Sequence, residues 1–179
     1  MRVLIAAVCA DNIIGVNGDL PWPRIPADMA LFKRVTKDQI VVMGRKTWES
    51  LPSKYKPLPD RINAVVTRDT SFNPGSLAVE ILTGFSDAYL KQLETKYPGK
   101  DIYIIGGADI YNTAIDHALI DEALITRVHY TVDMTTSIDP QSIRRLNLPA
   151  LSKLIPLQTV SPLTNEPVVC FLETYAQLV

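Results

Sequence analysis

One acidic residue stands on an apolar face of a predicted helix. Residues 27–36 are predicted to be helical, and Asp28, Phe32 and Val35 share one face of that helix. A bare charge buried there is costly, so the carboxylate needs a partner. Burial would raise the pKa of the carboxyl group, which suits an acid that binds an amidine-like group and handles protons near neutral pH. The alternative is an acid that only favours the positive end of the helix dipole.

Two predicted strand-to-helix junctions carry glycine. A strand over residues 40–43 leads into Gly44, and a strand over 102–105 leads into Gly106 and Gly107. Basic and hydroxyl side chains follow the first junction: Arg45, Lys46 and Thr47. Helix starts favour phosphate and glycines allow close backbone approach, so the two junctions together predict a phosphate-bearing ligand. Either junction alone could be an ordinary turn, and the eight glycines form no G-x-G-x-x-G motif.

A third candidate is an arginine that follows a proline-stiffened loop. Arg61 comes after residues 57–60 (Pro-Leu-Pro-Asp) and precedes a predicted strand. Its guanidinium could bind a ligand carboxylate through two parallel hydrogen bonds, or it could be an ordinary exposed side chain. Residues 24–68 hold ten basic and four acidic side chains, a net charge of +6, whereas the rest of the chain carries −7. This stretch is therefore either a solvated surface or the part that holds a small anionic ligand.

Strand-like and helix-like segments alternate along the chain and must position these residues. A continuous apolar run over residues 3–9 is typical of a strand buried on both faces. Further strands are predicted over residues 40–43, 62–67, 77–81, 102–105, 123–130, 154–160 and 168–175. Helices are predicted over residues 27–36, 86–97 and 108–115, with a short helix ending near residue 51. The pattern predicts an α/β fold, a single domain over residues 1–179 whose central, mostly parallel, mixed sheet of about eight strands is flanked by helices.

The composition excludes several other classes of protein. The chain has 179 residues, of which 47% are hydrophobic and 21% are charged, as in an ordinary globular protein. A net charge of −1 provides no global basic field for nucleic acid, and no run approaches the ~20 apolar residues of a membrane span. Cys9 and Cys170 favour free thiols and a cytoplasmic location. His117 and His129 lack the neighbours of a metal site, so no metal is expected.

Five motifs occur in a fixed order along the chain. They are Ile14-Gly15-x-x-Gly18-x-Leu20-Pro21-Trp22; Pro26-Ala27-Asp28-x-x-x-Phe32-Lys33; Met43-Gly44-Arg45-Lys46-Thr47-Trp48; Pro57-Leu58-Pro59-x-Arg61-x-Asn63; and Ile105-Gly106-Gly107 with Tyr111. Together they resemble dihydrofolate reductase, over residues 1–130 and more loosely in the C-terminal strand. The resemblance implies the fold of that family and the NADPH-dependent reduction of 7,8-dihydrofolate to 5,6,7,8-tetrahydrofolate, which supports one-carbon and thymidylate metabolism.

The same resemblance implies a role for each catalytic residue. Asp28 would hold the pterin 2-amino group and N3 and would support protonation of N5. Thr126 matches the strand position that hydrogen-bonds this acid. Trp22 would position a water molecule beside the acid, and Leu20 lies in the mobile loop that closes over the nicotinamide.

The resemblance also assigns residues to the two ligands. The implied substrate-binding residues are Ile5, Asp28, Met29, Phe32, Lys33, Leu51, Arg61 and Thr126. The implied NADPH-binding residues are Ala7, Ile14, Gly15, Gly44, Arg45, Lys46, Thr47, Thr67, Arg68, Ile105, Gly106, Gly107, Ala108 and Tyr111. Phe32 and Leu51 would enclose the rings of the substrate, and Arg61 would bind its glutamate α-carboxylate. A cis peptide is implied between Gly106 and Gly107.

The sequence departs from the family pattern at two places, and two alternative functions remain open. Asp60 stands where the family usually has glycine, and the Asp-Thr-x-Phe-Pro stretch of the family is not recognisable after Asp133. An NADPH-dependent reductase of riboflavin synthesis shares the scaffold but would not need Asp28, Phe32 and Arg61 together. A non-catalytic nucleotide-binding module on the same fold is the other alternative. The expected partner is a small-molecule substrate, with no nucleic acid and no membrane, and the expected state is a monomer.

Overall fold

A computed structural model describes residues 1–130, 144–145, 154–160 and 170–177 of the chain. Within these residues, eight strands form one sheet in the order β5-β4-β3-β6-β1-β7-β10-β9. They are β1 (Arg2–Val8), β3 (Ile40–Gly44), β4 (Ile62–Val66), β5 (Val79–Leu82), β6 (Ile102–Ile104), β7 (Glu122–Val128), β9 (Leu154–Val160) and β10 (Cys170–Gln177). Neighbouring strands from β5 to β7 are parallel, and β10 and β9 add antiparallel pairs at one edge. The mostly parallel α/β fold predicted from the sequence is confirmed.

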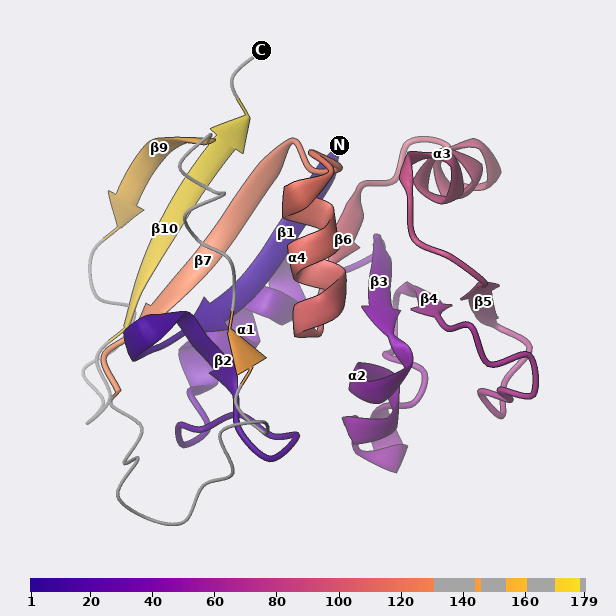
Figure 1. Cartoon of the computed structure of the whole chain (residues 1–179), viewed down its shortest axis with the longest axis horizontal. Helices are drawn as coiled ribbons and strands as arrows, with labels where there is room; N and C mark the ends of the chain where they lie inside the picture. Colours follow the sequence, from indigo (N-terminus) through magenta and orange to yellow (C-terminus); the bar gives the residue numbers. More distant parts are fainter. Residues whose placement is uncertain (131–143, 146–153, 161–169, 178–179) are drawn as a thin grey trace.

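Helices cover both faces of this sheet. They are α1 (Pro26–Val35), α2 (Arg45–Ser50), α3 (Asp87–Lys96) and α4 (Ala108–Asp116). Figure 1 shows α4 in front of the central strands and α1 behind them. Short 3-10 turns over Ala10–Asn12 and Ser53–Tyr55 lie in the connecting loops. None of the described helices is long and apolar enough to cross a lipid bilayer.

Strand β1 explains why the first apolar run has no polar alternation. Its side chains point alternately to the two faces, and both faces are buried. Leu4 is fully buried in the core that includes residues of α3 and α4. Ile5, on the other face, belongs to the core against which α1 packs. Burial of each such aliphatic side chain stabilises the fold by about 1.5–3 kcal/mol. The strand lies between β6 and β7, so neighbouring strands cover both of its edges.

The carboxyl ends of the central strands bring the two glycine junctions together. Strands β3 and β6 are parallel, with Val42 opposite Ile104. Beyond the ends of the ladder, the Gly44 N–H donates a hydrogen bond to the Gly106 oxygen at 2.7 Å. The opposite, amino edge of the sheet carries the starts of β3, β4 and β6, so Arg61 lies there, directly before β4.

Two local predictions from the sequence differ from the structure. The strand expected over 77–81 begins at Val79, because Val79 and Leu82 are the buried residues whereas Leu77 is fully exposed. The strand expected over residues 168–175 is β10, two residues further along the chain.

A second, two-stranded sheet was not predicted. It pairs β2 (Ile13–Gly15) with β8 (Arg144–Arg145), in antiparallel fashion. Segments of two or three residues carry no hydrophobic period that a sequence could reveal. The rest of the stretch over residues 133–151, which the sequence left without an interpretation, lies outside the described residues. The Cys170 side chain also lies outside them, whereas Cys9 is a buried free thiol.

Candidate active site

The acid of helix α1 is hydrogen-bonded to a threonine of strand β7. Pro26 begins the helix, so Asp28 lies in its first turn, and the register of the sheet places Thr126 beside Ala7 of β1. The Thr126 hydroxyl donates to Asp28 Oδ1 at 2.6 Å. Burial raises the pKa of the Asp28 carboxyl group, and the hydrogen bond from Thr126 opposes this rise only in part. Among the described residues, no hydrogen bond reaches Oδ2, which leaves that oxygen for a ligand donor.

Apolar and aromatic side chains form the core on the face of the sheet against which α1 packs. Ile5 is buried, and Phe32, Leu51 and Ile105 are partly buried against the same core. The Tyr111 hydroxyl donates to the Ile5 oxygen at 2.7 Å. Burial raises the pKa of Tyr111 strongly, and the charge of Asp28 adds to the effect, which places the two groups in one low-dielectric region. Such surroundings suit a flat ring system with one polar edge.

Arg61 lies at the other end of the same helix. Its Nε donates to Thr36 Oγ1 at 2.7 Å and its Nη2 to the Lys33 oxygen at 3.1 Å, while Nη1 bonds the Pro59 oxygen. The guanidinium carbon lies 5.6 Å from the centre of the Phe32 ring. Eight residues separate Asp28 from Thr36, or about 12 Å along a helix axis. The carboxyl group of Asp28 therefore lies at the first turn of α1 and the guanidinium of Arg61 at its last turn.

At the carboxyl edge of the sheet, the backbone of two glycines packs closely against neighbouring side chains, and Gly106 is buried. The peptide between Gly106 and Gly107 is cis, as the resemblance implied, and Gly106 has φ +103°. A Cβ on Gly106 would lie 2.8 Å from the Tyr111 ring. A Cβ on Gly107 would lie 3.3 Å from the Thr47 hydroxyl. These positions form a narrow cradle of backbone and hydroxyl groups, which only glycine leaves open.

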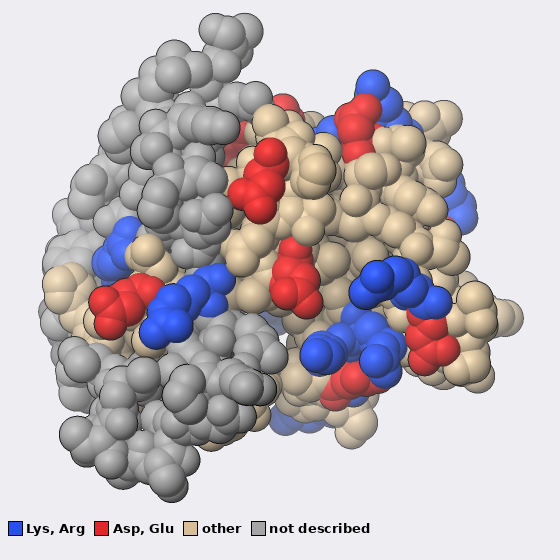
Figure 2. All heavy atoms as spheres, in the orientation of Figure 1, with Lys and Arg blue, Asp and Glu red and all other residues tan. Residues whose placement is uncertain are grey.

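Basic side chains gather over α2, beside this cradle. Figure 2 shows them over α2 and the neighbouring loop, with acidic side chains next to them. Arg45 forms an ion pair with Glu49 at 2.8 Å. Hydrogen bonds from Ser71 lower the pKa of the Asp69 carboxyl group, and the charge of Arg45 lowers it further. Arg45 therefore lies close to two carboxylates and to the end of β4, where it could bind a phosphate group.

The chain matches a known protein family over most of its length. The family model described as dihydrofolate reductase matches residues 1–145. The chain belongs to the dihydrofolate reductase family. Every motif that carried the resemblance lies inside the matched range.

Individual relatives agree with the family. Dihydrofolate reductase from Heliothis virescens is 35% identical over 150 residues, which cover 77% of this chain and 80% of that protein. Dihydrofolate reductase type A13 from Escherichia coli is 37% identical over 131 residues, 73% of this chain and 72% of the relative. A bifunctional dihydrofolate reductase-thymidylate synthase from Daucus carota is 34% identical over 145 residues, 75% of this chain but 27% of that longer protein.

A solved structure has the same fold. It is dihydrofolate reductase from Enterococcus faecalis, complexed with NADP(H) and RAB-propyl. The TM-score is 0.78 and the sequence identity 25%, and the match covers 100% of this chain and 97% of the other. The family likeness therefore extends from the sequence motifs to the three-dimensional fold.

The loop between β2 and α1 carries two candidate catalytic residues, Leu20 and Trp22, which differ in burial. Trp22 is 5% exposed and packs with the core that includes Cys9 and Ile25. Leu20 is 52% exposed and contributes no core contact. The structure thus anchors one end of this loop and leaves the tip in solvent.

Some candidate residues touch the site through the backbone or not at all. Met29 and Lys33 on α1 are exposed, and Lys33 reaches Arg61 through its carbonyl oxygen rather than its ammonium group. Lys46 and Arg68 are exposed, whereas Thr67 is buried at the end of β4. The remaining candidates are partly buried: Ala7, Ile14, Gly15 and Ala108.

The sequence analysis assigned no role to two polar residues that hold the Arg61 end of the site, although Asn63 stands in one of the five motifs. Thr36 is fully buried, donates to the Phe32 oxygen at 2.6 Å and accepts from Arg61. Asn63 accepts from the Leu58 N–H at 3.0 Å and donates to the Leu58 oxygen at 2.9 Å, which closes the loop before β4. A threonine at a helix end is common, so only its burial reveals the role. In the described part of the chain, no group of three or more His, Cys, Asp or Glu side chains could hold a metal ion.

Proposed function

We propose that this protein reduces 7,8-dihydrofolate to 5,6,7,8-tetrahydrofolate with NADPH. The reaction adds to the pterin ring a hydride, which NADPH would supply, and a proton at N5. The observation that carries the proposal is the largely buried Asp28 carboxyl group, hydrogen-bonded to Thr126 at 2.6 Å in a chain of this family. The pterin presents an amidine-like edge, formed by its 2-amino group and N3, that a carboxyl group recognises with two hydrogen bonds.

Asp28 and its neighbours bind and orient the ring to be reduced. The Thr126 hydroxyl donates to Oδ1, which fixes the orientation of the carboxyl group and leaves Oδ2 for donors of the ligand. Burial raises the pKa of Asp28, which brings its proton closer to the range where it can support protonation of N5. Ile5, Phe32 and Leu51 supply apolar walls, which exclude water and hold the ring in position for hydride transfer.

Arg61 is suited to bind the glutamate of the substrate. Three of its nitrogens already donate to protein oxygens, so the guanidinium does not have to be ordered when a carboxylate arrives. Arg61 is bonded to Thr36, which lies about 12 Å from Asp28 along the axis of α1, so the pterin and the glutamate of one substrate molecule can occupy the two ends. Phe32, which lies under the guanidinium, packs between them.

The carboxyl edge of the sheet fits the cofactor. NADPH supplies the hydride when bound. Gly106 and Gly107 carry no side chain, so their backbone can approach the cofactor closely. A Cβ would also be crowded by Tyr111 at Gly106 and by Thr47 at Gly107. Arg45 and Arg68 would hold the 2′-phosphate that distinguishes NADPH from NADH. The ion pair of Arg45 with Glu49 opens at little cost, because both side chains are well exposed.

The two alternative functions are not favoured. A riboflavin-pathway reductase or a nucleotide-binding module would need the carboxyl edge but not an acid with a raised pKa together with Arg61. Both alternatives also leave the match to the dihydrofolate reductase family model without a cause. The proposal extends to a single domain that acts as a monomer in the cytoplasm, and size-exclusion chromatography with light scattering would test the monomer.

One assay tests the proposed function. Purified protein is mixed with dihydrofolate and NADPH, and the loss of NADPH absorbance is followed. We expect turnover with NADPH and much weaker turnover with NADH. No turnover by protein that circular dichroism shows to be folded would contradict the proposal.

A further inference from the structure

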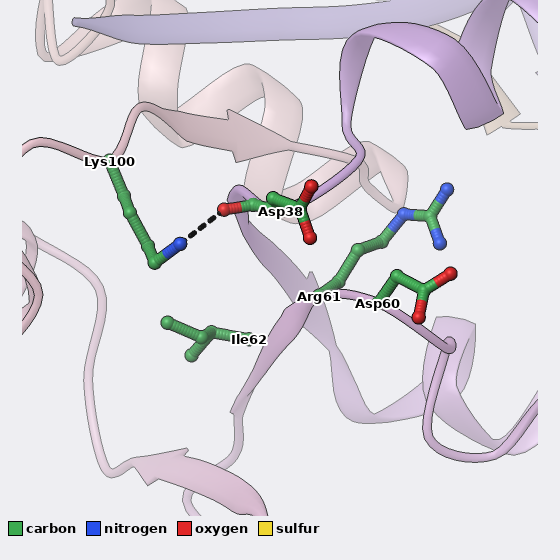
Figure 3. Close-up of a pocket in the computed structure, with 5 residues that line it drawn as sticks. All are labelled: Asp38, Asp60, Arg61, Ile62 and Lys100. Atoms are coloured by element: carbon green, nitrogen blue, oxygen red, sulfur yellow. Dashed lines mark hydrogen bonds between the residues drawn. The ribbon is translucent and has the colours of Figure 1, made fainter.

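A cavity of about 250 Å³ opens beside Arg61 at the amino edge of the sheet. Its lining consists of Asp38, Asp60, Arg61, Ile62 and Lys100. Figure 3 shows the two carboxyl groups on the same side as the Arg61 side chain, with Ile62 and Lys100 on the other. The cavity therefore combines two acids with two basic residues at the end of the site where a substrate tail would leave the protein.

The two acids are fixed next to Arg61 by the backbone. Asp38 and Asp60 have φ values of +61° and +56°, in the left-handed region that aspartate tolerates better than most residues. The Asp38 N–H donates to the Asp60 oxygen at 2.7 Å, which joins the two turns. Burial lowers the pKa of Arg61, and the charges of both acids act in the opposite direction. Both carboxylates are thus close enough to Arg61 to stabilise its charged form.

Both basic residues of the cavity donate hydrogen bonds to backbone oxygens and keep their charge. The Lys100 ammonium group donates to the backbone carbonyl oxygen of Asp38 at 2.5 Å, not to its carboxylate. Arg61 is held by α1 and, in the proposed function, takes the α-carboxylate of the single glutamate of dihydrofolate. Any further γ-linked glutamate would continue past Arg61 and bring its carboxylates towards Asp38 and Asp60.

We infer that Asp38 and Asp60 make this end of the site selective for a substrate with one glutamate, by repelling the carboxylates of γ-extended tails. This inference rests on the proposed function, because it takes Arg61 as the anchor of the first glutamate. The repulsion acts between exposed charges, so each acid changes the preference by a factor of a few rather than by orders of magnitude. It also weakens as salt screens the charges.

The test compares kcat/KM for dihydrofolate carrying one and four glutamates. Asp38→Asn and Asp60→Asn remove the charge, and asparagine also tolerates the left-handed backbone. We expect each variant to raise the ratio of tetraglutamate to monoglutamate kcat/KM about threefold, and the double variant about tenfold. In 0.5 M salt the difference from the unaltered protein should shrink. Asp11→Asn is the matched control, because Asp11 is an exposed acid with φ +55° outside the cavity.

Three results would overturn the inference. The first is that Asp38→Asn and Asp60→Asn change the ratio of tetraglutamate to monoglutamate kcat/KM no more than the control Asp11→Asn. The second is a marked preference of the unaltered protein for the tetraglutamate. The third is a severalfold fall of the ratio in Lys100→Gln with no rise in Asp60→Asn, because the cavity would then attract long tails through its lysine.

A separate measurement distinguishes failure of this inference from failure of the proposed function. Absence of turnover with the monoglutamate contradicts the function and leaves the charge effect to be measured by binding. The two folates are then titrated against each protein, and quenching of tryptophan fluorescence gives the ratio of their Kd values. The same threefold change in Asp60→Asn is expected, and its absence would contradict the inference.

Discussion

The buried hydroxyl of Thr36 holds the guanidinium of Arg61, whose Nε donates to it at 2.7 Å. The same hydroxyl donates to the Phe32 oxygen at 2.6 Å, so both of its functions as donor and acceptor are used. One residue at the end of α1 thereby joins the helix to a side chain from the start of β4. The position of the proposed carboxylate anchor depends on this contact as much as on Arg61 itself.

Removal of that hydroxyl should weaken substrate binding selectively. In Thr36→Val the Arg61 Nε loses its acceptor, at a cost of about 1 kcal/mol. We expect the KM for dihydrofolate to rise about fivefold while kcat changes little. Steady-state kinetics with NADPH in excess measures both. Thr36→Ser, which keeps the hydroxyl, is the control and should restore most of the affinity; equal losses in the two variants would remove the hydroxyl from this role.

Removal of Arg61 should affect the substrate tail alone. Arg61→Leu deletes the guanidinium but leaves Asp28 and Thr126 in contact at the other end of α1. We expect KM for dihydrofolate to rise by about two orders of magnitude, because a charge-assisted contact worth about 3 kcal/mol is lost. A reduced pteridine without glutamate should be bound nearly as before. A similar loss for both compounds would show that Arg61 does not bind the tail.

Neutralising the acid of α1 should abolish most of the chemistry at neutral pH. Asp28→Asn keeps the shape of the side chain but cannot hold or transfer the proton that N5 needs. We expect kcat to fall by about 10²–10⁴-fold. The Kd of NADPH, measured by fluorescence, should stay close to its original value, since the Asp28 carboxyl group is hydrogen-bonded to Thr126 and, among the described residues, makes no hydrogen bond to the glycine cradle. High remaining activity would show that another group supports the protonation.

The raised pKa of Asp28 also makes a prediction about stability. In the folded protein this carboxyl group binds its proton more tightly than in the unfolded chain, whose pKa is near 3.8. Stability therefore falls as the pH rises from about the unfolded pKa to the folded one, and each unit of the shift costs about 1.4 kcal/mol. Urea unfolding between pH 4 and 7 should show the unaltered protein losing stability relative to Asp28→Asn as the pH increases. A difference that is independent of pH would contradict the raised pKa.

A methyl group at the first glycine of the cradle should destabilise the fold. In Gly106→Ala the new Cβ would lie 2.8 Å from the Tyr111 ring, at a residue with φ +103°. We expect the free energy of unfolding to drop by about 3 kcal/mol. Gly99→Ala is the matched control, because Gly99 also has a positive φ, of +80°, but no atom within 4 Å of the added Cβ. Its loss should be about 1 kcal/mol, and equal losses in urea unfolding would refute the steric cause.

Local patterns predicted most of the framework because the burial of each element is periodic along the chain. The unbroken apolar run of β1 follows from burial on both faces, and the apolar face of α1 identified Asp28 as an unusual acid. Where the hydrophobic pattern was short or weak, the predicted bounds of the strand were wrong or the strand was not predicted. Strand β5 begins two residues later than expected, and the three residues of β2 carry no period at all.

The departure at Asp60 shows the limit of an expectation based on resemblance. The position has φ +56°, the region in which glycine is least strained, so the usual residue there has a clear physical basis. Aspartate tolerates the same backbone, and the loop before β4 keeps Arg61 in contact with α1. The sequence showed the substitution, but only the folded chain placed the second carboxylate, that of Asp38, beside the same arginine.

By itself, the sequence determined the class of fold, the family and the residues with chemical capacity, because these follow from side-chain type and from short-range spacing. The tertiary structure decided which of those residues meet. Thr36 and Arg61 lie 25 residues apart in the chain and share a hydrogen bond that no local pattern predicted, whereas the contact between Asp28 and Thr126, 98 residues apart, was expected only from the family resemblance. Such contacts depend on the order and register of the strands, which arise only when the whole sheet packs against its helices.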